Sequence, residues 1–144
     1  MLCTPSDAAP APDAARGQLL AWTGEIEQLD AHLVAAGRAL SGMQICLGLA
    51  ASRQLMRQPE GGIDCLNTYC HMERVQENVQ LLRDSNRRYA TVLSLMEVAW
   101  KWIDAGTLKM TQTMLTQHIV EVQAMLAHIQ DVTDTLPQLV IQPA

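Results

Sequence analysis

A heptad repeat of apolar residues runs without interruption through much of the N-terminal half of the chain. The apolar side chains recur at alternating steps of three and four residues. They are Leu19, Trp22, Ile26, Leu29, Leu33, Ala36, Leu40, Met43, Leu47 and Ala50. A repeat that extends beyond about three heptads is typical of a long helix packed along a coiled-coil seam. We therefore predict a helix over residues 18–58.

A short break separates this seam from a second one. Pro59, Gly61 and Gly62 predict the end of the first helix, and Asp64 is suited to cap a second helix over residues 64–105. The second seam consists of Cys65, Thr68, Met72, Val75, Val79, Leu82, Asn86, Tyr89, Leu93, Met96, Trp100 and Ile103. Two helices of about forty residues joined by a short loop favour an antiparallel hairpin.

Four glycines oppose a long first helix. Gly24, Gly37, Gly42 and Gly48 each cost about 1 kcal/mol relative to alanine in a helix interior. None of them occupies a seam position. We expect the first helix to bend or break near Gly37 or Gly42, or another backbone to approach closely there.

The segment IDAGTLKM predicts a second break. Gly106 is suited to cap the end of the second helix and Thr107 the start of a third, over residues 107–136. The alternative is one helix that continues through Gly106. Residues 1–17 are rich in Ala, Pro and Asp and are expected to form a disordered tail. Residues 137–144 begin with proline and are expected to be extended.

These elements predict an all-α fold with a single helical domain over residues 18–136. Its architecture is an elongated antiparallel helical hairpin, resembling a coiled coil, with a third helix. Only 17% of the residues are charged, against about a quarter in ordinary soluble domains, and 49% are apolar. Because so few charges cannot cover much exposed surface, we expect the chain to form part of a larger helical bundle.

Charge and composition exclude several classes of protein. The net charge of −5 argues against nucleic-acid binding, and we interpret the arginines at positions 74, 83, 87 and 88 as a solvated helix face rather than a basic patch. No run approaches the ~18–20 uninterrupted apolar residues of a membrane span, and no secretory signal is visible. The four cysteines form no disulfide framework, which favours an intracellular, cytoplasmic location.

The segment CLNTYCHM is the one local pattern that suggests a metal site. Cys65, Cys70 and His71 could ligate zinc or copper if they converged. On a helix, however, Cys65 and Cys70 diverge by roughly 140°, so we favour Cys65 as a small buried apolar residue. His118 could act as a pH switch, although a hydrogen-bonded core histidine is the favoured interpretation. No catalytic motif is visible, and we predict no enzyme activity, cofactor or metal.

Asn86 interrupts the second seam with an amide. Pairing the two helices about the loop at 59–63 places it opposite Ala35 and Ala36, which carry no polar side chain. A buried amide without a partner costs about 1–3 kcal/mol. We hypothesise that Asn86 fixes the register or partner choice of a helix from another chain. In that case Asn86→Leu raises thermal stability but makes the oligomeric state or pairing less specific. The alternative is that Asn86 faces water at a gap beside these alanines.

A second apolar row lies on a neighbouring face of the same helix and comprises Val92, Leu95, Ala99 and Trp102. A helix that is apolar all round is normally buried on several sides. We therefore predict that this row, together with Asn86, is a partner-binding surface with Trp102 as its anchor. The alternative is that the third helix of the same chain covers the row.

The predicted function is a non-enzymatic coiled-coil scaffold or adaptor subunit. Its partners are other helical chains, in a homo-oligomer or a hetero-complex, with no nucleic acid and no membrane span. The alternative is a small helical regulator or chaperone that sequesters a helix of its client. The eight methionines permit this alternative, because methionine adapts to varied partners.

Overall fold

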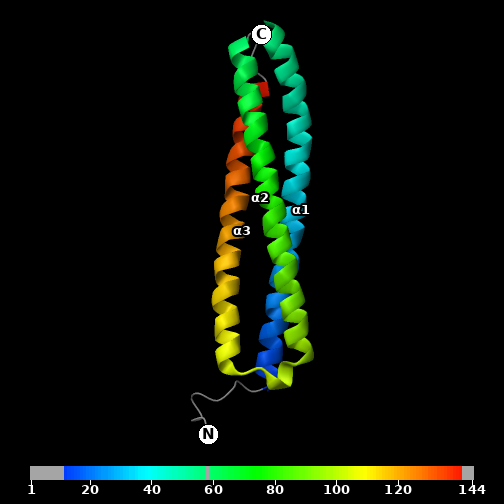
Figure 1. Ribbon diagram of the computed structural model, residues 1–144, viewed down its shortest axis with the longest axis vertical. Coiled ribbons are helices and arrows are strands. Elements are labelled where there is room, and N and C mark those ends of the chain that lie inside the picture. The colour runs from blue at the N-terminus through cyan, green and yellow to red at the C-terminus, as the bar shows by residue number, and fades with distance from the viewer. Residues whose placement is uncertain (1–11, 58, 141–144) are drawn as a thin grey trace. The chain divides into compact units, whose positions relative to one another are not determined.

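The computed structural model describes residues 12–57 and 59–140 of the chain. Three helices, α1 (Pro12–Arg57), α2 (Pro59–Val98) and α3 (Ala105–Val140), account for nearly all of them, and a short 3₁₀ helix, η1 (Trp100–Trp102), lies between α2 and α3 (Figure 1). No described residue belongs to a strand. The fold is all-α, a helical hairpin followed by a third helix, as the sequence predicts.

The heptad repeats form the buried sides of the helices. In α1 the seam residues are buried apart from Ala36 and Met43, which are half-buried. In α2 the buried seam residues are Cys65, Met72, Val75, Val79, Asn86, Leu93 and Met96. In α3 the buried row is Leu108, Leu115, Val122 and Ile129, with His118 beside it. The apolar periodicity therefore identifies the core correctly.

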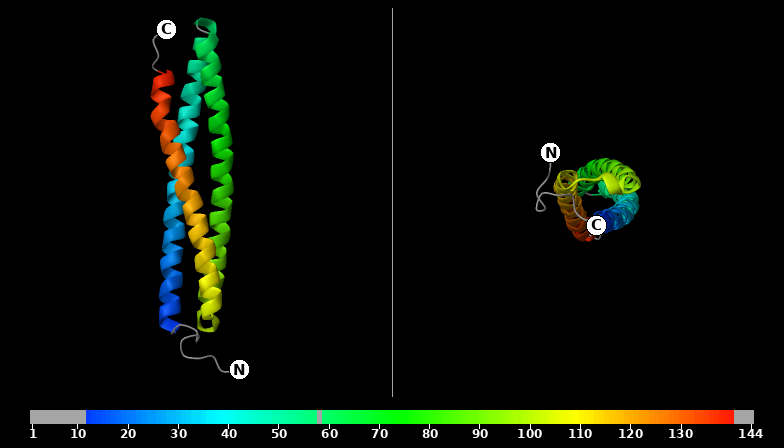
Figure 2. Two further views of the ribbon diagram at one scale, coloured as in Figure 1. Left: turned by 90° about the vertical axis from the view of Figure 1, so that its left-hand side faces the viewer. Right: turned by 90° about the horizontal axis from the view of Figure 1, so that it is seen from below.

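Contacts within the chain divide it into two compact units, where the sequence predicts a single domain over residues 18–136. The described part of unit 1 comprises residues 12–31 and 84–122, and that of unit 2 comprises 32–57, 59–83 and 123–140. Each unit contains one segment of each of the three helices. Within a unit the α1 and α2 segments are antiparallel, as are the α2 and α3 segments (Figure 2).

The hairpin between α1 and α2 is tighter than predicted. α2 begins at Pro59 instead of residue 64, because proline is well suited to the first turn of a helix, where its missing N–H removes no hydrogen bond. Gly61 and Gly62 lie inside the helix rather than ending α1, and neither has a positive φ. The prediction of Asp64 as an N-cap is therefore wrong.

The break between α2 and α3 is confirmed, but its caps differ from those predicted. α2 ends at Val98, and the chain continues through η1 to Asp104, whose Oδ1 accepts a hydrogen bond of 2.6 Å from the Thr107 amide. Asp104 thus caps α3, which begins at Ala105. Hydrogen bonds from Thr107, chiefly from its backbone N–H, lower the pKa of the Asp104 carboxyl. Gly106 caps nothing, and the alternative of one continuous helix is excluded.

α1 passes through its glycines as a single helix of 46 residues. A Cβ atom at Gly42 would meet nothing within 4 Å, and one at Gly37 would lie 3.9 Å from the Cγ1 atom of Val79. A break of the helix at these glycines, or a close backbone beside them, is therefore wrong. Residues 12–17 are also helical rather than a disordered tail, and residues 137–140 continue α3 instead of being extended. The tail predictions for 1–11 and 141–144 fall outside the described residues.

Candidate functional site

The amide of Asn86 lies in the core of unit 1 and is fully paired there. Its side chain is 1% exposed, and its Nδ2 donates a hydrogen bond of 2.8 Å to the main-chain carbonyl of Ile26 in α1. Its Oδ1 lies 2.9 Å from the Nε2 atom of His118 in α3. Both predicted roles of Asn86 are therefore corrected: the amide needs no partner from another chain, and it does not face water.

The pairing of Asn86 also fixes the tautomer of His118. The Ile26 carbonyl can only accept, so the Asn86 amide must present Nδ2 to it and Oδ1 to the imidazole. The imidazole must then carry a hydrogen on Nε2, which leaves Nδ1 bare in the neutral ring. His118 is a hydrogen-bonded core histidine, as favoured from the sequence.

Tyr89 packs against His118, the partner of Asn86. Its ring lies against the imidazole of His118 with the centroids 4.7 Å apart, and its hydroxyl donates to the carbonyl of Met114 at 3.3 Å. A cleft of about 240 Å³ opens beside both rings and is also lined by Glu121. Burial lowers the pKa of His118, and the nearby charge of Glu121 opposes this effect.

The apolar row of unit 1 is exposed rather than covered by α3. Leu95 and Val92 lie open to solvent on the last turns of α2, and Ala99, in the turn that follows, is half-buried. Trp102, in η1, is 85% exposed. The structure thus brings the four row residues onto one open stretch of chain, but it places Asn86 in the core, away from them.

Sequence reasoning missed one member of this surface. Val98 is 86% exposed and follows Leu95 by three residues at the end of α2. A helix that continues to residue 105 places Ala99 rather than Val98 in the row, whereas α2 ends at Val98. We call Val92, Leu95, Val98 and Trp102 the α2 apolar surface.

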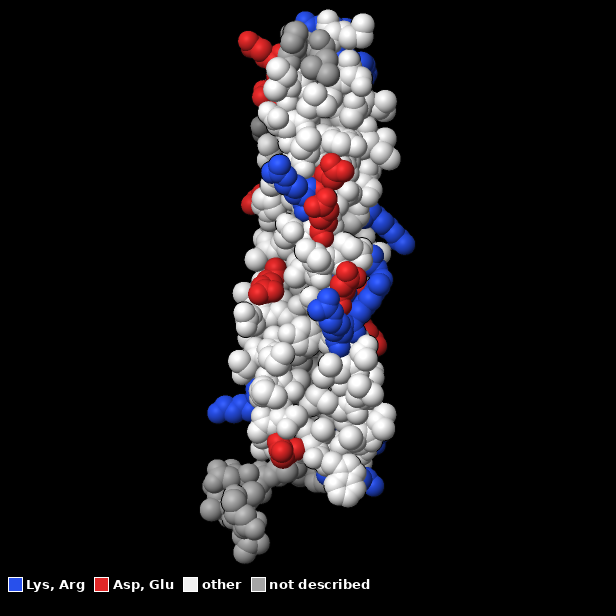
Figure 3. Space-filling view, viewed as in Figure 1, with Lys and Arg blue, Asp and Glu red and all other residues white. Residues whose placement is uncertain are grey.

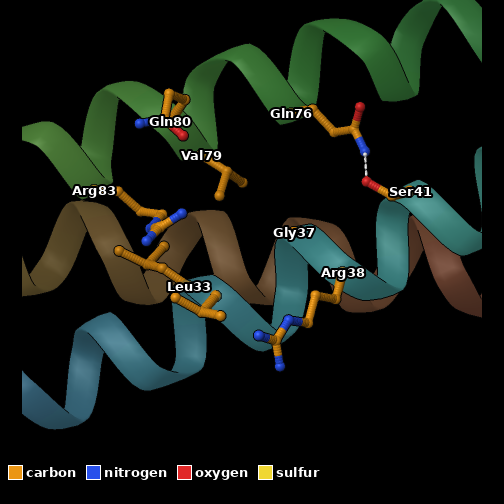
Figure 4. A pocket seen from close by; sticks show the side chains of 9 residues that line it. Leu33, Gly37, Arg38, Ser41, Gln76, Val79, Gln80 and Arg83 are labelled. Carbon is orange, nitrogen blue, oxygen red and sulfur yellow. Dashed lines mark hydrogen bonds between the residues drawn. The ribbon is translucent and has the colours of Figure 1, made fainter.

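A cleft of about 510 Å³ lies between α1 and α2 in unit 2. Gly37 forms part of its wall, and the Gln76 Nε2 donates a hydrogen bond of 2.8 Å to the Ser41 hydroxyl across it (Figure 4). The guanidinium-bearing side chains of Arg38 and Arg83 also line it. Among the described residues, the side chains that line this cleft include no histidine and no carboxylate.

The Cys65, Cys70 and His71 pattern does not form a site. Cys65 is buried and Cys70 is exposed, as expected on two sides of a helix. Burial, and secondarily the charge of Asp64, raise the pKa of the Cys65 thiol. Within the described ranges, no group of three or more His, Cys, Asp or Glu side chains is placed to hold a metal ion.

His71 instead meets a histidine that the sequence did not indicate. Its Nε2 lies 3.1 Å from the Nε2 of His128 in α3, with the rings perpendicular and their centroids 5.2 Å apart. The pairing follows from antiparallel packing about the break at residues 99–104, which puts residue 71 about one turn from residue 128.

The surface charges do not gather into a single patch on the face shown in Figure 3, where basic and acidic side chains lie interspersed among uncharged ones.

The segment Ala14–Arg53 of α1 is long and apolar enough to cross a membrane by length and composition, although the sequence predicts no span. The apolar window of this segment is 22% buried, and one such helix is weak evidence for a span, because core helices and N-terminal signal sequences meet the same criterion.

Comparisons of this chain with protein-family models, with curated proteins and with solved structures found no match.

Proposed function

We propose that this protein is a non-enzymatic scaffold or adaptor subunit that binds a helix of another protein chain through the α2 apolar surface. The observation that carries the proposal is the exposure of Trp102 and Val98, at 85% and 86%, beside Leu95. Tryptophan is among the residues that dominate protein–protein interfaces. An exposed tryptophan within a group of exposed aliphatic side chains favours a surface that a partner covers.

The area involved is large enough to matter for binding. An aromatic side chain of this size buries roughly 150–250 Å² when covered, which is worth about 4–6 kcal/mol at ~25 cal/mol per Å² before the entropic losses of association. Trp102 alone therefore supplies enough gross free energy to anchor a complex. Val92 and Leu95 add exposed apolar area on the preceding turns of α2.

The spacing of the surface favours a helix as the partner. Val92, Leu95 and Val98 follow one another at steps of three residues and so lie within about 120° around α2. A second helix can cover an apolar face of this width. The partner helix would run along the last turns of α2 and continue past Val98 to reach Trp102 in η1.

Free thiols at Cys46, Cys65 and Cys70 support an intracellular, reducing location.

The test compares Trp102→Ala with Met56→Ala, which removes an equally open apolar side chain from unit 2. For a homo-oligomer, sedimentation equilibrium of purified protein should show Trp102→Ala weakening self-association by about 2 kcal/mol, roughly 30-fold, and Met56→Ala leaving it unchanged. For a hetero-complex, the same comparison is made by calorimetry with a partner helix purified from the native source. Equal behaviour of both variants in both assays refutes the proposal.

Two exposed methionines favour a second candidate, a small helical regulator or chaperone. Met110 and Met114 are 61% and 51% exposed and lie one turn apart on α3 in unit 1. Flexible thioether side chains can repack against different client helices. A chaperone should be stable alone and exchange its clients, whereas a constitutive subunit should be poorly soluble until it is co-expressed with its partner.

A further inference from the structure

Two imidazole nitrogens converge in unit 2 from two different helices. His71 comes from α2 and His128 from α3, and their Nε2 atoms are 3.1 Å apart. Both side chains are exposed, so the pair contributes little to the core. Nothing in the proposed scaffold function uses these two residues.

The separation of the nitrogens matches that of two ligands on one metal ion. An ion at about 2.0–2.1 Å from each nitrogen, with an angle of about 90–109° between them, places the nitrogens ~2.8–3.4 Å apart. The observed 3.1 Å lies within this interval. We propose that His71 and His128 together bind one divalent transition-metal ion, of the class of Ni²⁺, Cu²⁺ and Zn²⁺, through their Nε2 atoms.

The protons of the two rings are compatible with this site. In the metal-free pair one Nε2 donates its hydrogen to the other, so one ring has its hydrogen on Nε2 and the other on Nδ1. Binding requires the first ring to move its hydrogen to Nδ1 by exchange with water, which frees both Nε2 lone pairs. Each ring then binds the ion through its Nε2 lone pair and keeps its hydrogen on Nδ1.

The surroundings leave room for the remaining ligands. His71 lines a cleft of about 320 Å³ together with Asp131, which follows His128 by about one turn on α3. Because no third His, Cys, Asp or Glu in the described residues is placed as a ligand, water fills the other coordination positions. The carboxylate of Asp131 adds negative charge beside the cation, and imidazole ligands favour nickel, copper and zinc over calcium or magnesium.

The ion would also join α2 to α3 within unit 2. A ligand that binds the folded state and not the unfolded one stabilises the folded state by mass action. Metal should therefore raise the melting temperature of the protein, and loss of either histidine should abolish the rise.

The test is calorimetric titration of the untagged full-length chain with Ni²⁺, which prefers imidazole to thiolate and so discriminates against cysteine sites. The expected result is one site per chain, weakened about 100-fold by His71→Ala or by His128→Ala, because each leaves a single imidazole. His32→Ala removes another exposed histidine of unit 2 and should leave binding unchanged, as should Cys70→Ser beside the site. Far-UV circular dichroism checks that each variant remains helical.

Three results overturn the inference. They are the absence of Ni²⁺ binding at one ion per chain, affinity unchanged in both His71→Ala and His128→Ala, and loss of binding in Cys70→Ser. The last result would assign the ion to the thiol. Melting curves with and without saturating Ni²⁺ give a second readout, in which a shift retained by His128→Ala counts against the pair.

Discussion

Replacing Asn86 by leucine should destabilise unit 1, contrary to the expectation drawn from the heptad pattern. The two side chains have the same number of heavy atoms, but the contacts of the amide are hydrogen bonds of 2.8 and 2.9 Å. A methyl group needs about 3.5–4.0 Å from its neighbours, so the leucine cannot take up the position of the amide without shifting α1 or α3. The apolar gain of the substitution is therefore largely lost to strain.

The Asn86→Leu substitution also costs stability because it removes the hydrogen-bond partner of His118. Its Nε2–H would stay buried, in a residue only 4% exposed, with no acceptor. A buried donor left in this way costs about 1–3 kcal/mol. The Ile26 carbonyl loses less, because it can still accept the backbone hydrogen bond within α1. We expect Asn86→Leu to lower the free energy of unfolding of unit 1 by about 1–3 kcal/mol.

A double-mutant cycle isolates the pair. His118→Leu alone should also destabilise, because it leaves the Asn86 Oδ1 without its donor, but the double variant should be destabilised by less than the sum of the singles, with a coupling of about 1–3 kcal/mol. The chain's three tryptophans, Trp22, Trp100 and Trp102, all belong to unit 1, so urea unfolding followed by their fluorescence reports on that unit.

Asn67→Leu serves as the control for this cycle. Asn67 is exposed on α2 in unit 2, and its replacement should change stability by no more than about 0.5 kcal/mol when unfolding is followed by far-UV circular dichroism, which reports on the helices of both units. An increase in the unfolding free energy of Asn86→Leu, or strict additivity of the two single substitutions, would refute the pairing described above.

Three further predictions follow from burial and local geometry. Burial holds the pKa of folded His118 below its unfolded value near 6.5, so the unfolded chain binds more protons than the folded one. The free energy of unfolding should therefore fall as the pH drops through about 6.5. His118→Leu should flatten this pH dependence when urea unfolding is measured at a series of pH values. Gly42→Ala should raise the free energy of unfolding by about 1 kcal/mol in chemical denaturation, because a Cβ there meets nothing within 4 Å; a loss of stability would show that the helix needs glycine at this position. Alkylation followed by mass spectrometry should label Cys46 and Cys70 within the folded protein and Cys65 only after unfolding, and early labelling of Cys65 would contradict its burial.

The fold was largely predictable because long apolar repeats determine which side of each helix is buried. The seam from Leu19 to Ala50 correctly identifies the core side of α1, and the break before α3 was found from Gly106 and Thr107. The boundaries were less predictable. Gly61 and Gly62 have weak helix propensity, but the packing of the hairpin overrides that preference, so both lie inside α2.

The errors in the site came from one small error in pairing. Centring the hairpin on residues 59–63 placed Asn86 opposite Ala35, whereas the end of α1 at Arg57, the start of α2 at Pro59 and the direction of helical carbonyls bring it to Ile26. A side chain's hydrogen-bond partner depends on displacements of a single helical turn, which periodicity alone does not determine. His118 could have been assigned to Asn86 by pairing α2 with α3 about their own break.

The Asn86 amide forms its two hydrogen bonds with different kinds of group on α1 and α3. From α1 it takes a main-chain carbonyl, and every residue of that helix carries an equivalent group. From α3 it takes an imidazole, and His118 is the one histidine of the α3 segment in unit 1. The hydrogen bond to Ile26 therefore does not select the register of α1, which is set by its apolar seam. The hydrogen bond to His118 does select the register of α3 against α2 in unit 1.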